Sequence, residues 1–136
     1  KIFFVNNFFY ISKMIPYDKR SGKIWYNGEL VDWSDVKVHV LSHGLHYASC
    51  VFEGLRVYDG EIFKLEEHTR RLFHSAKRMG MKVPYSEEEI NIATKQIVDL
   101  QKFYHIDALH LGCDMRVRGL AECSIFPDPQ KPWHGW

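Results

Sequence analysis

The chain has 136 residues, of which 46% are hydrophobic and 26% are charged, and its formal net charge is +1. This length suits one domain with a single buried core, and the composition is ordinary for a soluble globular protein. Because the net charge is close to zero, composition gives no electrostatic basis for binding nucleic acid or an anionic membrane.

The three cysteines are Cys50, Cys113 and Cys123, and no two of them form a Cys-x-x-Cys pair. An odd number without such a pair argues against a disulfide framework or a zinc ribbon. It favours a reducing compartment, and we therefore expect the cytoplasm.

Residues 1–22 are predicted to be a leader followed by a turn-rich segment. The apolar run in residues 1–13 is split by two asparagines, and no small-residue cleavage site of a signal peptide follows it. It is also shorter than the about 20 apolar residues that span a bilayer. We expect Met14 to be the natural start, and a short membrane-surface anchor is the alternative.

The next segments have strand character. Lys23–Tyr26 and Glu29–Trp33 flank Asn27-Gly28, a pair typical of a tight hairpin turn because both residues tolerate positive φ. Val36–Leu41 alternates valine and histidine and continues the β character. Ser42–Ser49 is predicted to make one helical turn with Ser42 as its cap.

A second hairpin is predicted from Val51–Tyr58, the turn Asp59-Gly60 and the partner Glu61–Lys64. Two helices follow. The first carries an apolar stripe and stops at Gly80, and the second opens with a capping box formed by Ser86 and Glu89. The two stripes are Leu65, Leu72, Ala76 and Met79, and then Ile90, Ala93, Ile97, Leu100 and Tyr104.

Strands followed by helices, with hairpin connections, indicate an α+β domain in which two helices pack on one side of an antiparallel sheet. From Leu109 onward neither the strand nor the helix period is evident, and residues 127–136 are proline-rich and typical of a loop.

Several words of the sequence resemble the branched-chain amino acid aminotransferases, the fold type IV enzymes that depend on pyridoxal phosphate. The resemblance covers residues 23–108. It rests on Trp25-Tyr-Asn-Gly-Glu-Leu-Val, Lys37-Val-His-Val-Leu-Ser-His, Leu45-His-Tyr, Val51-Phe-Glu-Gly-Leu-Arg and Glu67-His-Thr-Arg-Arg-Leu. In the family such words belong to the small N-terminal domain, which roofs a cofactor held mainly by a larger domain.

The resemblance implies that Arg71 binds the phosphate of pyridoxal phosphate, because the family arginine directly before this leucine does so. A guanidinium offers forked donors to a dianion and does not deprotonate. The alternative is an ion pair between Arg71 and Glu67, one helical turn back. Arg70 is expected to pair with Glu66 and to face water.

Phe52, Gly54 and Arg56 are expected to lie on one face of their strand, since alternate side chains point the same way. By resemblance, Phe52 and Gly54 line the pocket for an aliphatic substrate side chain and Arg56 orients neighbouring groups. Phe52 as plain core is the alternative. Tyr47 resembles a family tyrosine that reaches into the partner subunit's site, which implies a homodimer or higher oligomer. An amphipathic surface tyrosine is the alternative.

His39, His43 and His46 invite a metal hypothesis, since 43 follows 39 by four residues and 46 follows 43 by three. No acidic residue falls between them as in a His-Glu-x-x-His helix, and the family binds no metal here. We therefore predict no metal site.

The family's lysine, which holds the cofactor and moves the proton, and the acid beside the pyridine nitrogen belong to the large domain. Lys131 is the only lysine after Lys102, and its surroundings do not resemble the family's lysine motif. We therefore assign no catalytic residue in this chain and expect it to be inactive alone.

Residues 109–136 are predicted to be a non-native tail. After Ala108 the family has Tyr-Ile-Arg-Pro and then Val-Ala-Trp-Arg-Gly, whereas this chain has Leu109-His110 and later Arg118-Gly-Leu-Ala121. A shift of one base can convert codons for the second set into codons for the first, which suggests a frameshift near residue 108.

The sequence thus predicts a fragment of a transaminase that moves an amino group from leucine, isoleucine or valine to 2-oxoglutarate. A fragment of a D-amino acid aminotransferase or aminodeoxychorismate lyase is one alternative. A non-catalytic fragment or dimerisation module is another.

Overall fold

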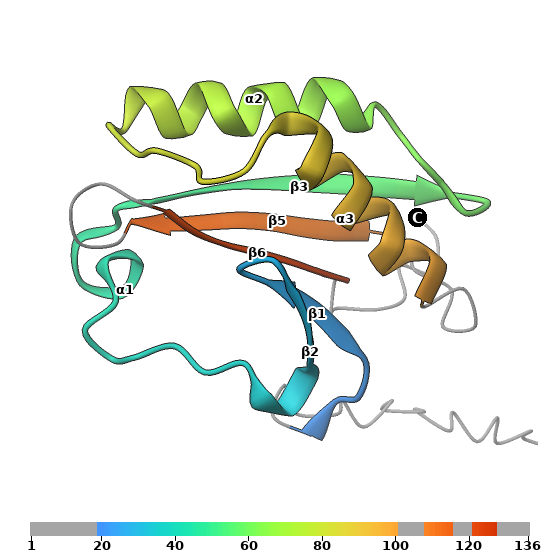
Figure 1. Cartoon of the computed structure of the whole chain (residues 1–136), viewed down its shortest axis with the longest axis horizontal. Helices are drawn as coiled ribbons and strands as arrows, with labels where there is room; N and C mark the ends of the chain where they lie inside the picture. Colours follow the sequence, from blue (N-terminus) through green and yellow to red (C-terminus); the bar gives the residue numbers. More distant parts are fainter. Residues whose placement is uncertain (1–18, 101–107, 116–120, 128–136) are drawn as a thin grey trace, which may run out of the picture.

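The computed structural model describes residues 19–100, 108–115 and 121–127 and contains a six-stranded sheet in the order β2-β1-β6-β5-β3-β4 (Figure 1). All neighbouring strands run antiparallel. The strands are β1 (Lys23–Tyr26), β2 (Glu29–Asp32), β3 (Cys50–Tyr58), β4 (Glu61–Ile62), β5 (Ala108–Met115) and β6 (Ala121–Pro127). The helices are η2 (Trp33–Asp35, 3-10), α1 (His43–Tyr47), α2 (Leu65–Arg78) and α3 (Glu87–Leu100). The predicted α+β fold is confirmed.

Both predicted hairpin turns are present. Asn27 and Gly28 have φ of 49° and 95°, and Asp59 and Gly60 have φ of 49° and 84°. Positive φ at both central residues is the twist that a two-residue hairpin requires. The prediction of β character for Val36–Leu41 was wrong, since no strand forms there. Alternation alone does not make a strand where no neighbouring strand of the described sheet pairs with the segment.

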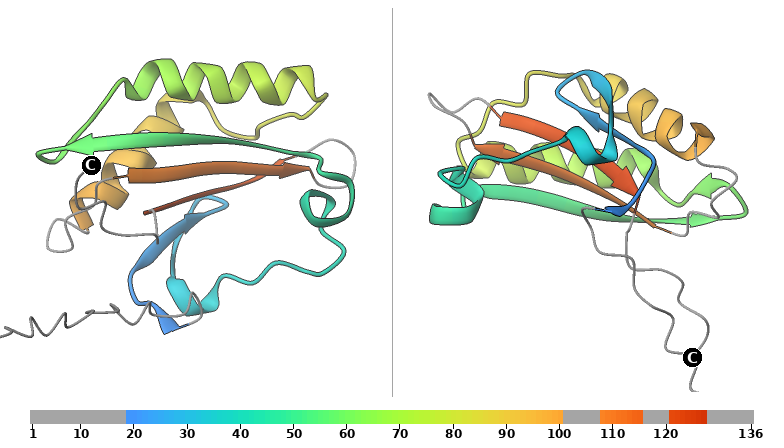
Figure 2. Two further views of the ribbon diagram at one scale, coloured as in Figure 1. Left: turned by 180° about the vertical axis from the view of Figure 1, so that it is seen from behind. Right: turned by 90° about the horizontal axis from the view of Figure 1, so that it is seen from below.

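The strand β3 has two chemically different faces. Its side chains alternate between exposed and buried along all nine residues, and the odd-numbered ones are buried. Helix α2 lies along β3, and α3 crosses the sheet over β1 and β6 (Figures 1 and 2). The odd-numbered face of β3 is therefore part of the core, and the even-numbered face is open among the described residues.

Helices α2 and α3 form largely for the predicted reasons. Ser86 and Glu89 make a reciprocal capping box: the Ser86 amide donates to the Glu89 carboxylate at 2.7 Å, and the Glu89 amide donates to Ser86 Oγ at 3.1 Å. Gly80 follows α2 with φ of 72°, as expected of a C-terminal stop. Thr69 Oγ1 donates to Asn91 Oδ1 at 2.6 Å, which ties the two buried helix faces together.

The predicted stripes are buried except near the helix ends. Met79, the residue that closes α2, and Leu100, the last residue of α3, are exposed, so both predictions were wrong. Tyr104 and the leader with Met14 lie outside the residues that the structure describes. The buried stripe residues are Leu65, Leu72, Ala76, Ile90, Ala93 and Ile97.

The absence of a period after Leu109 was also a wrong prediction for the residues that form β5 and β6. Leu109, Leu111 and Cys113 are buried on alternate positions of β5, and Ala121, Cys123 and Ile125 are buried on alternate positions of β6. The apolar residues of each strand are therefore separated by single residues, which is the period of a half-buried strand. Both strands lie in the interior of the sheet order and complete the face that the helices cover.

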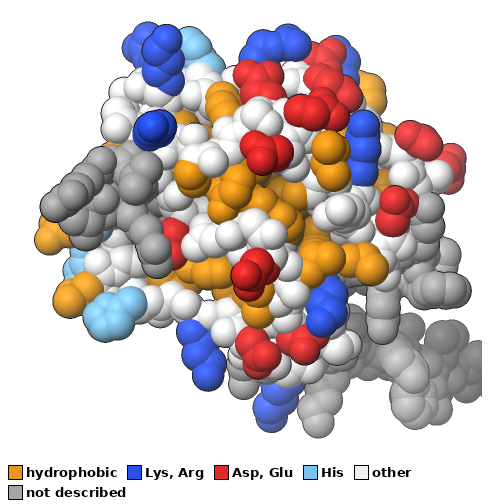
Figure 3. All heavy atoms as spheres, in the orientation of Figure 1, with side chains coloured by type: hydrophobic (Ala, Val, Ile, Leu, Met, Phe, Trp, Pro, Cys, Tyr) orange, Lys and Arg blue, Asp and Glu red, His pale blue; other side chains and the backbone are white. Residues whose placement is uncertain are grey.

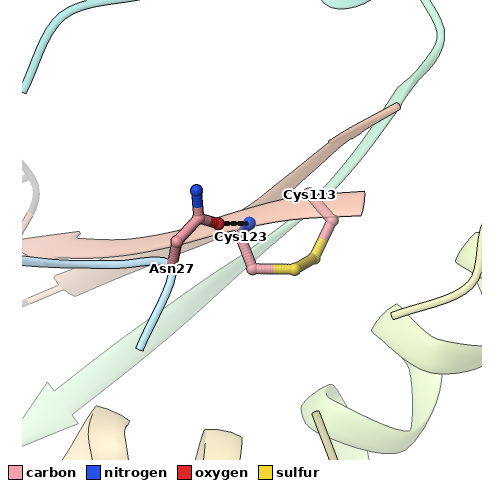
Figure 4. Close-up of a disulfide and its surroundings, with 3 residues drawn as sticks. All are labelled: Asn27, Cys113 and Cys123. Atoms are coloured by element: carbon pink, nitrogen blue, oxygen red, sulfur yellow. Dashed lines mark hydrogen bonds between the residues drawn. A yellow bond between two sulfur atoms is a disulfide. The ribbon is translucent and has the colours of Figure 1, made fainter. Parts of the chain in front are cut away.

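Cys113 and Cys123 lie directly opposite each other on β5 and β6 and form a disulfide, with their Cα atoms 4.2 Å apart (Figure 4). The sequence did not predict this pair, because the pairing depends on the register of two strands that it did not predict. Asn27 Oδ1 accepts a hydrogen bond from the Cys123 amide at 3.0 Å, so the first hairpin turn is joined to β6. Cys50 remains free and exposed.

The lengths and hydropathies of the helices in the described segments provide no candidate for a membrane span.

Candidate functional site

The most strongly connected polar group of the described sheet and helices is a carboxylate–guanidinium pair between β3 and α2. Arg71 donates from Nε to Glu53 Oε1 and from Nη2 to Glu53 Oε2, both at 2.6 Å. The Glu53 side chain is 5% exposed, whereas the Arg71 side chain is 64% exposed. The partner of Arg71 is thus a buried residue of the strand rather than Glu67 on its own helix. A two-point fork of this kind fixes the plane of the guanidinium as well as its position.

His68 completes the cluster from one helical turn before Arg71. Its Nδ1 lies 2.9 Å from Glu53 Oε2 and 3.4 Å from Arg71 Nη2. Since Nη2 is always a donor, the shorter contact is the one that matters, and the tautomer with a proton on Nδ1 donates to the carboxylate. Both oxygens of Glu53 therefore have partners, as a buried carboxylate requires.

These contacts determine the charge state of the cluster. Burial by itself would raise the pKa of the Glu53 carboxyl, but the hydrogen bonds and charges of Arg71 and His68 outweigh it and hold that pKa below its ordinary value. The hydrogen bond and charge of Glu53 in turn raise the pKa of Arg71. The pair is ionised at neutral pH.

Glu53 and His68 were not assigned a role from the sequence, although a signal for them exists. The alternation of β3 places Glu53 between Val51 and Leu55 on the buried face, where an unpaired carboxylate is very costly. Such a position demands a cationic or donor partner on the covering helix. His68 and Arg71 stand three residues apart on that helix and can meet one carboxylate.

The other predicted residues of β3 lie on its open face. Phe52, Gly54 and Arg56 are all exposed and alternate with buried neighbours, so the prediction that they share a face is confirmed. Phe52 is 76% exposed, which rules out the plain-core alternative within the described part of the chain. A Cβ added at Gly54 would meet no atom within 4 Å, so local packing does not require glycine there.

The structure does not bring Arg71 to the same face as Phe52 and Gly54. Arg71 is reached through Glu53 on the covered face, and the two groups are separated by the thickness of β3. On the side away from β5, β3 pairs in the described sheet only with the short β4, at Val57 and Tyr58. The rest of that edge is where a single ligand could contact both groups.

Tyr47 ends α1 and is 72% exposed, with its ring 5.3 Å from that of His43 and 6.2 Å from that of His46. Histidines and exposed apolar side chains gather at the corner that α1 occupies (Figure 3). His39 is engaged locally, since its Nδ1 accepts from the Leu41 amide at 3.1 Å. Across the described ranges, no three His, Cys, Asp or Glu side chains are grouped to hold a metal ion.

Comparison with known proteins identifies the family. The model of the amino-transferase class IV family matches residues 50–120, which is more than half of the chain. The chain therefore belongs to the class IV aminotransferases.

Individual relatives are branched-chain aminotransferases. The curated branched-chain-amino-acid aminotransferase of Pseudomonas aeruginosa is 55% identical over 83 residues, which are 58% of this chain and 27% of that protein. The structure of the branched-chain aminotransferase from Thermoproteus uzoniensis with norvaline matches with a TM-score of 0.72 and 35% identity, over 82% of this chain and 42% of the other. The solved T.th. enzyme, complexed with N-(5'-phosphopyridoxyl)-L-glutamate, matches with a TM-score of 0.68 and 33% identity, over 78% of this chain and 40% of the other.

The chain thus spans only a part of each of these relatives, about a quarter of the curated protein's length. The matched part of the solved enzymes includes the described sheet and helices, and the likeness covers more of this chain than the sequence matches do.

The pKa of Glu53 makes stability depend on pH in a definite direction. Because this pKa is lowered from its ordinary 4.5, the pair contributes fully above that value, and the contribution is lost as the pH falls through the lower folded value. We expect Glu53→Gln to lower the free energy of unfolding at pH 7 and to lower it much less at about pH 3. Urea denaturation at both pH values measures this, with the exposed Glu67→Gln as control. An equal loss at both pH values would contradict the assignment.

Proposed function

We propose that this chain forms the small-domain wall of a branched-chain amino acid transaminase. The parent reaction passes an amino group from leucine, isoleucine or valine to 2-oxoglutarate, and pyridoxal 5'-phosphate, when bound, supplies the electron sink for that chemistry. The family and the branched-chain relatives support the enzyme class and the substrate class. The observation that carries the proposal is the guanidinium of Arg71, which is fixed in place yet mostly exposed.

Arg71 is the proposed phosphate ligand, and its geometry fits a phosphate group. A guanidinium has five N–H donors, and Glu53 engages only two of them, one on Nε and one on Nη2. The edge formed by Nη1 and Nη2 can therefore face a second anion. The solved relative that holds a phosphopyridoxyl compound supports the choice of that anion.

Phe52, Gly54 and Arg56 are proposed to serve the substrate. An exposed phenyl ring beside an open glycine provides an apolar surface with room for a branched aliphatic side chain. Arg56, on the same face, would orient neighbouring polar groups. The matched structure with norvaline, an aliphatic amino acid, supports this class of substrate.

Tyr47 is proposed to reach into the site of a partner subunit, so that the full enzyme is at least a homodimer. Its exposure at the end of a short helix suits such a role, because an amphipathic ring can cross an interface with its hydroxyl in a polar site. Sedimentation of the full-length enzyme tests this, and a monomer with full activity would rule it out.

The phosphate role of Arg71 predicts a specific loss of binding. Arg71→Gln should weaken the binding of pyridoxamine 5'-phosphate by about tenfold or more, because a charge-assisted fork is lost. We chose pyridoxamine 5'-phosphate because it has no aldehyde that could bond to lysines of the chain. Titrations followed by ³¹P NMR give the affinity.

Arg70→Gln is the matched control, since it removes an adjacent, exposed charge of the same helix. Pyridoxamine without phosphate is the ligand control. Equal losses in the two arginine variants would show only general attraction of an anion and would defeat the assignment.

The isolated chain is predicted to show no transaminase activity, because no lysine of it resembles the family's cofactor-bonding lysine. The assay combines the purified chain with pyridoxal 5'-phosphate, leucine and 2-oxoglutarate, followed by borohydride and mass spectrometry of any lysine adduct. Glutamate formation above the rate of free cofactor, or an adduct at one lysine only, would refute the prediction.

The non-native origin of residues 109–136 remains part of the proposal. It rests on the departure of this segment from the family words, while the family model's match extends to residue 120. The coding DNA decides it: codons that cannot yield the family words in another frame would exclude a frameshift.

A cytoplasmic location is proposed from the relatives' biosynthetic class and the absence of a candidate span in the described segments. Disulfides are rare in that compartment, so Cys113 and Cys123 should be reduced there. Acid-quenched cells treated with an alkylating reagent under denaturing conditions should give a chain with all three cysteines modified. Modification of Cys50 alone would place the chain in an oxidising compartment.

A further inference from the structure

We propose that Glu53 and His68 are positioning residues for phosphate binding: they hold the guanidinium of Arg71 by one edge and turn its other edge toward the phosphate of the cofactor. The inference rests on the proposed function, since it takes Arg71 as the phosphate ligand. It adds two residues to the site, neither of which contacts the phosphate directly.

Stability alone does not account for a carboxylate at position 53. Glu53 occupies a buried position of β3 between the apolar Val51 and Leu55. Buried ion pairs can often be replaced by apolar residues without loss of stability, because desolvation offsets their attraction. In this pair only the carboxylate is buried and the guanidinium is largely exposed, so the buried charge is used to hold a surface group.

The geometry of the fork leaves a defined set of donors. Glu53 takes the edge made by Nε and Nη2, with both distances at 2.6 Å. The edge made by Nη1 and the second proton of Nη2 then points away from the carboxylate, since the guanidinium is planar. Two parallel N–H groups on this edge match two oxygens of a phosphate monoester.

His68 acts on the carboxylate rather than on the arginine. Its Nδ1 lies 2.9 Å from Oε2, the oxygen that also accepts from Arg71 Nη2, and its side chain is 20% exposed. A second donor on Oε2 fixes the rotation of the carboxylate and thereby the plane of the fork. The order of contacts is His68 to Glu53, Glu53 to Arg71 and Arg71 to phosphate.

Charge gives the opposite expectation, which makes the inference testable. Glu53 is an anion beside a proposed anion site, so by charge alone its removal should strengthen phosphate binding. Positioning predicts weaker binding, because a long side chain that is no longer held must be ordered when the ligand binds. The sign of the change distinguishes the two.

The experiment titrates the full chain with pyridoxamine 5'-phosphate by ³¹P NMR at about 0.15 M salt, where exposed charges are partly screened. Glu53→Gln keeps the side-chain volume and should weaken binding about threefold to tenfold, with a smaller loss in His68→Gln. Glu67→Gln is the matched control, because it removes an exposed carboxylate one turn before Arg71 on the same helix. It should leave binding unchanged or slightly tighter.

Unchanged or tighter binding in a folded Glu53→Gln variant overturns the inference and leaves Arg71 as an unpositioned ligand. Failure of the proposed function is distinguishable, because in that case Arg71→Gln also binds as the unaltered chain does. A loss in Glu53→Gln with none in Arg71→Gln would likewise overturn the inference, since Glu53 is taken to act through Arg71.

A measurement on the unaltered chain serves if Glu53→Gln does not fold. The Arg71 Nε–H resonance should exchange slowly with solvent, as expected of a hydrogen bond to a buried carboxylate, and should keep its position when ligand is added. The Nη resonances should shift. An Nε–H resonance that moves with the ligand would mean that the phosphate displaces Glu53, and the inference would be wrong.

Discussion

The two-residue period of β3 is the constraint on which both the core and the candidate site depend. Alternate side chains of a strand point to opposite faces, so one strand contributes Leu55 and Val57 to the core and Phe52 and Gly54 to an open surface. A slip of one residue in its register would exchange the two sets completely. The long pairing of β3 with β5 opposes such a slip, since seven consecutive residue pairs define it.

Glu53 is the exception on the covered face, and it links the core to the site. A carboxylate at a core position can be tolerated only with strong partners, and α2 supplies them because it lies along β3. The same contact fixes the helix against the strand and fixes a guanidinium at the border of the sheet. Packing and ligand geometry are therefore set by one interaction rather than by two independent ones.

The sequence predicted those features that depend on neighbours along the chain. The hairpin turns at Asn27-Gly28 and Asp59-Gly60, the capping box of Ser86 and Glu89, and the shared face of Phe52 and Gly54 are local in this sense. Features that depend on pairing distant segments were not predicted. The partner of Arg71 is 18 residues away, and the cysteine pair requires the register of β5 against β6. The strand-like pattern of Val36–Leu41 was misleading because pairing, and not pattern, makes a strand.

The strands β5 and β6 also show how little sequence identity a sheet needs in its interior. They supply leucine, cysteine, alanine and isoleucine at alternate buried positions, and their backbones pair with β3 and β1 whatever the side chains are. A segment that differs from the family's words can therefore still close this sheet, provided that apolar residues alternate and no proline interrupts the ladder between them. Binding groups are less tolerant, since a phosphate or a substrate carboxylate needs a particular side chain at a particular place. The part of the chain that departs from the family after residue 108 can thus preserve the fold of the small domain while it lacks the family's residues for the reaction.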